Sequence, residues 1–194
     1  MAARAGAGEA PGGESGAPEG FVWPEFRSFP PFYTIQPVEQ TRERQLAVWR
    51  DLVVRFCRAA RLFVLTTDES DDGPLFQNEA INRKLPASGR VAVLDSLAAR
   101  GQAHWLDKHK RRCAVFFRPL EELADDLEKW ARDMGYSGSV VTFDEISSGP
   151  ETSHTDLHGM HHDALRIVAG VLERRGRAAV FASDVTGDEG IKFL

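Results

Sequence analysis

The sequence predicts an α+β fold, mainly α, with two tandem winged-helix domains, each built from three helices and a small antiparallel β-hairpin sheet. A stripe of apolar residues at helical spacing occurs twice, 74 residues apart, starting at Leu46 and at Leu120. A later helix in each half ends at a glycine, and these glycines, Gly101 and Gly176, are 75 residues apart. Two registers that agree within one residue indicate a tandem duplication. The element order in each copy is typical of a winged helix-turn-helix.

The chain divides into four segments by composition. Residues 1–20 are nearly all Ala, Gly, Pro, Glu and Ser, so we predict a disordered tail that could bury little on folding. Residues 21–40, rich in aromatic residues and proline, are the predicted docking arm. We assign the first winged-helix domain to residues 41–118 and the second to residues 119–194. Because no flexible linker separates them, we expect the two domains to pack as a rigid rod.

The elements of the first domain are predicted from the spacing of apolar residues and from capping, proline and glycine residues at their ends. A long helix is expected to begin at an N-capping Thr41 and to bury a stripe of Leu46, Trp49, Val53, Phe56 and Ala60. LFVLTT (62–67) predicts a strand, and PLFQNEAINRKL (74–85) a second helix with proline near its start. A third helix, RVAVLDSLAAR, is expected to be capped by Ser88 and ended by Gly101. QAHWL and CAVFF then predict two strands around the polar turn DKHKRR.

The second domain repeats this order. Its first helix carries the apolar stripe Leu120, Leu123, Leu127, Trp130 and Met134. SVVTF (139–143) predicts a strand, LRIVAGVLERR a helix ended by Gly176, and IKFL the last strand of the second hairpin. Between that strand and that helix, we expect residues 147–159 to form a loop that runs into a helix start.

Composition excludes several classes of protein. The 24 basic and 29 acidic side chains give a formal net charge of −5, which argues against a general nucleic-acid binder. No apolar run approaches the ~18 residues of a membrane span. The N-terminus lacks the hydrophobic segment of a secretory signal. Cys57 and Cys113, without a CxxC pattern, predict buried, reduced thiols in a cytoplasmic protein.

Catalytic and metal-binding patterns have little support. The chain has no GxSxG, P-loop, HExxH or GxGxxG motif, so we assign no catalytic residue and no cofactor. A histidine cluster comprises His154, His158, His161 and His162, and the i, i+4 spacing of His158 and His162 would suit zinc on a helix. Gly159 interrupts that pair, which favours a polar loop. We therefore assign no metal site.

A winged-helix nucleic-acid-binding or transcription-associated protein is the alternative interpretation. It would use the basic wing of residues 108–112, namely Lys108, His109, Lys110, Arg111 and Arg112, against phosphate. The helix that would enter the major groove offers only Arg90 and Arg100, and it also carries Asp95. The wing of the second domain, SDVTGDEG, is acidic and would repel DNA.

The segment FVWPEFRSFPPFYTIQP is the strongest anomaly. Its prolines argue against a helix, so we predict an extended segment, and so much aromatic area must dock on another surface. Pro30-Pro31-Phe32-Tyr33 satisfies PPxY, the pattern that WW domains bind as polyproline II, so a WW-domain ligand is a third hypothesis. We expect the early aromatics of the arm to cover the core of the chain's own first domain and PPFY to reach a partner.

These segments resemble a known family. WPEFRSFPPFYTIQP followed by TRERQLAVW is similar to the opening of the vacuolar protein sorting 25 family, the small subunits of the endosomal sorting complex ESCRT-II. PLFQNEAINRKLP, AHWLDK and the ending GIKFL resemble the same family, so the resemblance spans residues 21–194. The alanine–glycine tail and the histidine-rich HTDLHGMHHD depart from the family pattern.

The resemblance implies a non-enzymatic adaptor in multivesicular-body sorting of ubiquitinated membrane proteins. Two copies would join two larger winged-helix subunits of ESCRT-II, and the second domain would recruit and activate an ESCRT-III subunit. Membrane association would be indirect, through the complex, so we expect a cytoplasmic chain on the endosomal surface, with the nucleus as a further compartment. The implied partner-binding residues are Trp23, Phe29, Pro30, Pro31, Phe32, Tyr33, Pro37 and, in the second helix, Arg83.

Overall fold

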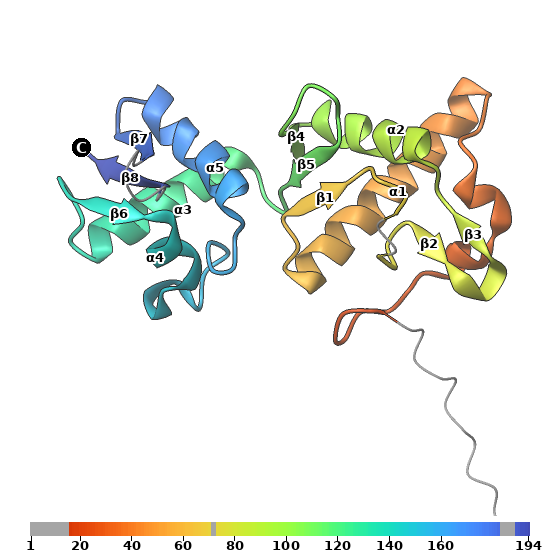
Figure 1. The fold of residues 1–194 in the computed structure, drawn as a ribbon, viewed down its shortest axis with the longest axis horizontal. Helices are drawn as coiled ribbons and strands as arrows, with labels where there is room; N and C mark the ends of the chain where they lie inside the picture. The colour runs from red at the N-terminus through yellow and green to blue at the C-terminus, as the bar shows by residue number, and fades with distance from the viewer. Residues whose placement is uncertain (1–15, 71–72, 183–188) are drawn as a thin grey trace, which may run out of the picture.

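The computed structural model describes residues 16–70, 73–182 and 189–194. They form two lobes that lie side by side along the long axis (Figure 1). The first lobe contains the short 3-10 helices η1 (Glu25–Ser28), η2 (Pro30–Tyr33) and η3 (Glu79–Ile81), the helices α1 (Glu39–Ala60) and α2 (Ala87–Ala98), and the strands β1 (Val64–Thr66), β2 (Gln77–Asn78), β3 (Arg83–Lys84), β4 (Ala103–Trp105) and β5 (Arg112–Val115). The second lobe contains α3 (Leu120–Asp133), β6 (Val140–Thr142), α4 (Phe143–Ser148), η4 (Pro150–Thr152), α5 (His162–Arg174), β7 (Ala178–Ala182) and β8 (Glu189–Phe193).

Both lobes hold a three-stranded antiparallel sheet of the same topology. The strand orders are β1–β5–β4 and β6–β8–β7, so in each lobe the strand after the first helix pairs with the last strand of the hairpin. A helix also precedes each hairpin and contacts its first strand, α2 against β4 and α5 against β7. This shared arrangement confirms the predicted α+β fold, mainly helical, in which a winged-helix order occurs twice.

The stripe on α1 forms the centre of the first core. Trp49 and Val53 are fully buried and Phe56 is nearly so, whereas Leu46 is half-buried and Ala60 is exposed at the helix end. Burying large apolar side chains along one helix face provides most of the stability of such a helix. The predicted stripe is therefore confirmed for its three central residues.

Residues 74–85 do not form the predicted second helix. β2 and β3 pair antiparallel around η3, and Asn82, at a left-handed φ of 48°, closes the turn. Phe76 and Leu85 are both buried in the first core, and the Leu85 N–H donates to the Phe76 carbonyl at 2.8 Å. On a helix, two residues nine positions apart would point in opposite directions, so only the hairpin lets both side chains enter the same core.

Two helices start earlier than predicted. α1 begins at Glu39 and α2 at Ala87, and neither has a side-chain cap. Thr41 and Ser88 therefore lie inside the first turns rather than at the caps. Pro86 sets the extended backbone that leads into α2, a position where the missing N–H of proline has no cost.

The sequence did not locate α4, the middle helix of the second lobe. Its start is a capping box: the Glu145 N–H donates to the Thr142 hydroxyl at 3.2 Å, and the Glu145 carboxylate accepts from the Thr142 N–H at 2.7 Å. The connection after it, predicted as a loop, consists mainly of turns around η4. The second lobe thus has the three predicted helices.

The lobes share apolar and polar contacts. Phe63 and Phe116, from the first lobe, belong to the hydrophobic cluster of the second lobe. Arg61, which ends α1 in the left-handed conformation, donates to the carbonyls of Thr155 at 3.1 Å and His158 at 2.5 Å. The histidine-bearing loop is therefore part of the contact between the lobes.

Asp163 adds a charged contact whose pH dependence can be measured. Burial alone would raise the pKa of Asp163, but the hydrogen bond and charge of Arg112 at 2.7 Å, with His161 and Arg166, outweigh burial and hold that pKa below its ordinary range. A carboxylate with a depressed folded pKa adds stability that is present above the unfolded pKa of about 3.9 and is lost as pH falls through the folded pKa.

Asp163→Asn is therefore expected to lower the free energy of unfolding at neutral pH. Because the variant has no carboxylate to protonate there, it should lose less stability than the wild type between about pH 5 and about pH 3. Urea unfolding at each pH measures both effects. Parallel pH curves for the two proteins would contradict this account of Asp163.

Candidate functional site: the docking arm

The arm is folded rather than extended. Residues 25–28 and 30–33 form η1 and η2, with extended residues before, between and after them. Pro30 and Pro31 open η2, where their missing N–H groups would have had no helical partner. PPFY is thus a 3-10 turn in this chain, which corrects the prediction of an extended segment and removes the polyproline II conformation that a WW-domain ligand needs.

The second half of PPFY is buried in the chain's own first lobe. The Phe32 ring stacks on the Trp49 ring at a centroid distance of 4.2 Å and an interplanar angle of 11°, and Trp49 Nε1 donates to the Phe32 carbonyl at 3.1 Å. Tyr33 is 2% exposed, and its hydroxyl donates to the Arg27 carbonyl at 3.2 Å. Both side chains pack on the buried ring of Trp49 in this chain. The expectation that PPFY reaches a partner stays a prediction.

The exposed apex of the arm consists of Phe29, Pro30 and Pro31. Phe29 is 61% exposed, so it does not cover the core of the first domain as we expected of the early aromatics. Its implied contact with a partner stays a prediction. Beside the apex lies an apolar hollow of about 420 Å³ against α1, and its walls include Phe26, Phe29, Pro31, Phe32, Arg44, Gln45 and Val48. Gln45 fixes the rim, because its amide donates to the carbonyls of Phe32 and Thr34 at 3.0 and 2.9 Å.

Arg27 anchors the arm, and the sequence did not single it out. Arg27 is 5% exposed, and its guanidinium lies over the Trp23 ring at 3.7 Å. The same group donates to the carbonyls of Pro74 at 3.0 Å and Gln77 at 2.8 Å. Trp23 is half-buried and stacks on Phe56, as expected of an early aromatic that covers its own core. An arginine inside an aromatic-rich segment is the only sequence signal for such an anchor.

The remaining predicted contact residues flank this apex. Arg83 lies on β3, not on a helix, and β3 contacts η2, so the arginine sits on the element next to the arm. Its side chain is exposed and donates to the Asn82 carbonyl at 3.1 Å. Pro37 is exposed just before α1. Phe29, Pro30, Pro31 and Arg83 therefore remain accessible to a partner, while Phe32 and Tyr33 support them from beneath.

Both cysteines and two histidines of the cluster have structural surroundings. Burial raises the pKa of the Cys57 thiol far above its ordinary range and that of Cys113 to about 12, and both are free and buried, as predicted. His161 Nδ1 caps α5 by accepting from the Asp163 N–H at 3.1 Å, and His158 Nδ1 is 3.1 Å from a threonine hydroxyl. Within the described ranges, no group of three or more His, Cys, Asp or Glu is placed to hold a metal ion.

The helix expected to enter the major groove of DNA has one of its two predicted base-reading arginines inside the core. Arg90 is 0% exposed, and its guanidinium donates to the carbonyls of Leu85 at 3.2 Å and Asp68 at 2.6 Å. Only Arg100, just beyond α2, remains exposed of the two predicted readers. Residues 183–188 of the acidic second wing, like residues 1–15 of the predicted tail, lie outside the described residues.

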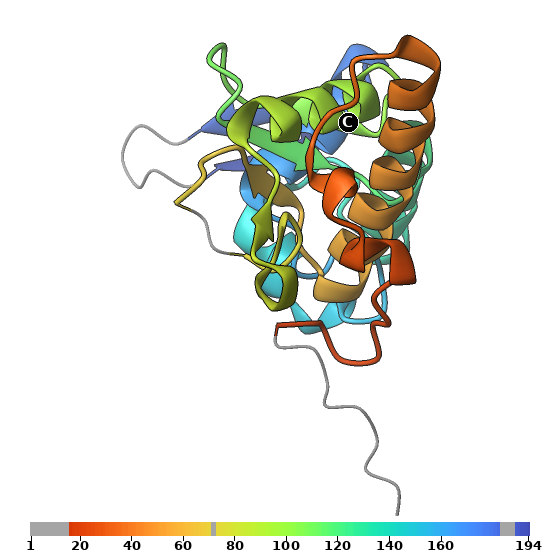
Figure 2. The same cartoon turned by 90° about the vertical axis from the view of Figure 1, so that its right-hand side faces the viewer.

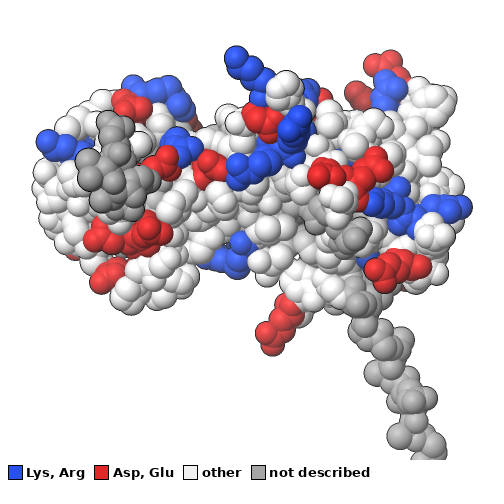
Figure 3. Space-filling model, viewed as in Figure 1, with Lys and Arg blue, Asp and Glu red and all other residues white. Residues whose placement is uncertain are grey.

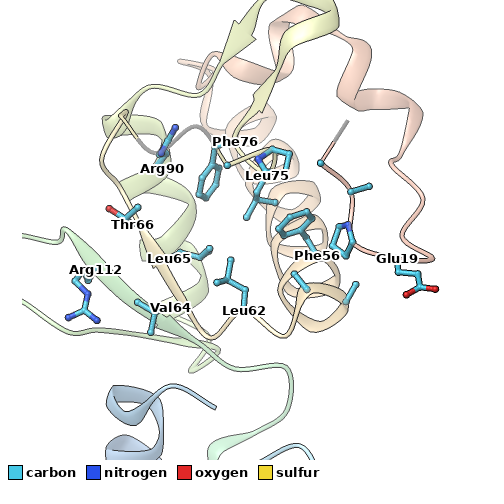
Figure 4. A pocket seen from close by; sticks show the side chains of 17 residues that line it. Glu19, Phe56, Leu62, Val64, Leu65, Thr66, Leu75, Phe76, Arg90 and Arg112 are labelled. Carbon is cyan, nitrogen blue, oxygen red and sulfur yellow. The ribbon is translucent and has the colours of Figure 1, made fainter. Parts of the chain in front are cut away.

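A second hollow, of about 830 Å³, lies on the first lobe near the start of the described chain. Its walls are mostly apolar: Phe56, Leu62 and Leu75 face it, with Arg90 and Arg112 toward one side and Glu19 at the other (Figure 4). Residues 16–19, part of the predicted disordered tail, form one wall. Arg90 is already bonded to carbonyls, so this hollow is an apolar surface rather than a reaction site.

Known proteins share this architecture. The family model of ESCRT-II complex subunits matches residues 26–161. Vacuolar protein sorting-associated protein 25 of Arabidopsis thaliana is 37% identical over 173 residues, which are 89% of this chain and 96% of that protein. The crystal structure of subunit VPS25 of the endosomal trafficking complex ESCRT-II superposes with a TM-score of 0.75 at 26% identity, covering 87% of this chain and 97% of the other. A chain of the crystal structure of endosomal complex ESCRT-II (VPS22/VPS25/VPS36) has a TM-score of 0.74 at 24% identity, covering 88% and 98%.

The fold and the arm define a tandem winged-helix protein that presents an aromatic apex on the surface of its first lobe. No helix among the described residues is long and apolar enough to cross a bilayer. The matches extend over most of the chain, and they show that it belongs to the ESCRT-II complex subunit family.

Proposed function

We propose that this chain is a non-enzymatic adaptor subunit of ESCRT-II whose arm and first domain bind the two larger winged-helix subunits. The main support is the exposed apex of Phe29, Pro30 and Pro31, held on a buried aromatic base. Exposed aromatic residues beside an apolar hollow are typical interface hot spots. The similar complex is described as VPS22/VPS25/VPS36, which names the two partners.

Preorganisation supports the same assignment. The apex needs no folding on binding, because Arg27, Trp49 and Gln45 already hold the arm by hydrogen bonds. A surface fixed before contact loses less conformational entropy on binding than a flexible segment would. Arg83, on the neighbouring strand, can donate to carboxylates or carbonyls of the partner and fix its orientation.

The second part of the proposal concerns the second domain, residues 119–194. It recruits and activates an ESCRT-III subunit and so couples the complex to membrane remodelling during multivesicular-body sorting of ubiquitinated membrane proteins. Met134 and Val140, exposed by 44% and 53%, are apolar surface available to a partner on that lobe. The chain then acts in the cytoplasm, on the endosomal surface, as part of the assembled complex.

Light scattering after size-exclusion chromatography tests the assembly. The full chain is co-expressed with the two larger subunits, and a stable complex with two copies of this chain is expected. The ESCRT-III subunit is then added and should co-elute only when this chain is present. A chain that elutes alone, or an ESCRT-III subunit that binds the larger subunits equally well without it, would overturn the assignment.

A further inference from the structure

The wing tip, residues 107–112 between β4 and β5, is a turn held by hydrogen bonds to Asp107. The Asp107 carboxylate accepts hydrogen bonds from the backbone N–H groups of His109 at 2.8 Å, Arg111 at 3.0 Å and Arg112 at 2.8 Å. These bonds, that of Arg112 above all, lower the pKa of Asp107. The acidic group of the tip thus points at its own backbone and shapes the turn.

Among the described residues, two of the four Lys and Arg side chains of the wing tip form ion pairs. Lys110 pairs with Asp95 at 2.6 Å, and Arg112 pairs with Asp163 at 2.7 Å. Lys108 and Arg111 are exposed, and neither has a carboxylate partner among the described residues. The tip therefore presents two uncompensated cations, with the exposed His109 beside them.

The tip stands out from the body of the protein. Figure 2 shows the β4–β5 hairpin projecting beyond the helices around it, and Figure 3 shows Lys and Arg side chains gathered over this hairpin. A chain with a net charge of −5 is repelled as a whole by polyanions, but a projecting tip can approach an anionic surface while the rest stays away from it.

We propose that the wing tip binds the surface of an anionic phospholipid membrane through Lys108 and Arg111. This inference rests on the proposed function, which places the chain at a membrane as part of a complex. It adds a direct lipid contact to the indirect association that the family resemblance implies. A flat headgroup layer fits the observations better than nucleic acid, because contact with it needs no base readout and Arg90 is buried. The arm would hold the partner subunits while the wing contacts lipid.

Vesicle co-sedimentation measures this contact. The full chain is titrated with vesicles of phosphatidylcholine containing about 30 mol% phosphatidylserine, where each cation near the surface adds roughly fivefold to partitioning. Lys108→Ala with Arg111→Ala is therefore expected to lower the partition coefficient about 25-fold. Binding of the wild type should weaken steeply with salt and be absent on vesicles of phosphatidylcholine alone.

Lys129→Ala with Arg58→Ala is the matched control, since it removes one lysine and one arginine that are exposed and have no carboxylate partner among the described residues. Equal loss in both double variants, unchanged binding of the wing variant, or no dependence on phosphatidylserine would overturn the proposal. Tip-dependent binding to a DNA duplex but not to vesicles would do the same. The chain is assayed alone and in the complex, so failure of assembly is seen separately from failure of lipid binding.

Discussion

Replacing Trp49 with alanine is expected to lower the free energy of unfolding by about 4 kcal/mol. Trp49 is 0% exposed, and its ring is the surface on which Phe32 stacks and against which Tyr33 packs edge-on. The substitution leaves a cavity under the arm and removes the donor to the Phe32 carbonyl. The arm should then detach from α1, because its two buried residues lose their shared contact.

Urea unfolding followed by circular dichroism measures this loss. Trp49→Phe is the matched variant: it keeps an aromatic ring beneath Phe32 and removes the indole donor, so we expect a loss of only about 1–2 kcal/mol. If the alanine and phenylalanine variants had the same free energy of unfolding, stacking of Phe32 on the ring at position 49 would not be what holds the arm.

Replacing both Phe29 and Pro31 with alanine is expected to weaken binding to the larger subunits by about 3 kcal/mol, roughly 150-fold. Phe29 is 61% exposed, so truncation removes partner contact without opening a cavity in the chain. Stability should stay within about 0.5 kcal/mol of the wild type. Changing Phe32 and Tyr33 instead would mix two effects, because both side chains belong to the first core.

Calorimetric titration of the two larger subunits with each variant provides the measurement. Val22→Ala is the control: Val22 is apolar and 80% exposed on the same arm, yet it lies outside the walls of the hollow beside the apex. We expect its affinity to remain near that of the wild type. An equal loss in the control, or none in the Phe29 and Pro31 variant, would remove the apex from the interface.

The spacing of apolar residues was sufficient to predict an element where burying one face of that element determines its structure. The stripe around Trp49 and Val53 and its copy around Leu123 and Leu127 predicted two long helices, and all four side chains are buried. The repeated register also predicted the common topology of the two sheets. The prediction over residues 74–85 was wrong because proline and apolar residues there suit either a helix start or a hairpin, and only core placement of Phe76 and Leu85 separates the two.

Composition alone predicted that the aromatic segment of residues 21–37 docks on a surface, since so much aromatic area is unfavourable in water. Which of its rings are exposed depends on the packing of the arm against the first lobe. Phe32 and Tyr33 lie over Trp49 and are buried, whereas the η1–η2 turn directs Phe29 away from the lobe. That outcome depends on the position of α1 beneath the arm, a contact between residues 17 positions apart along the chain that no local pattern encodes.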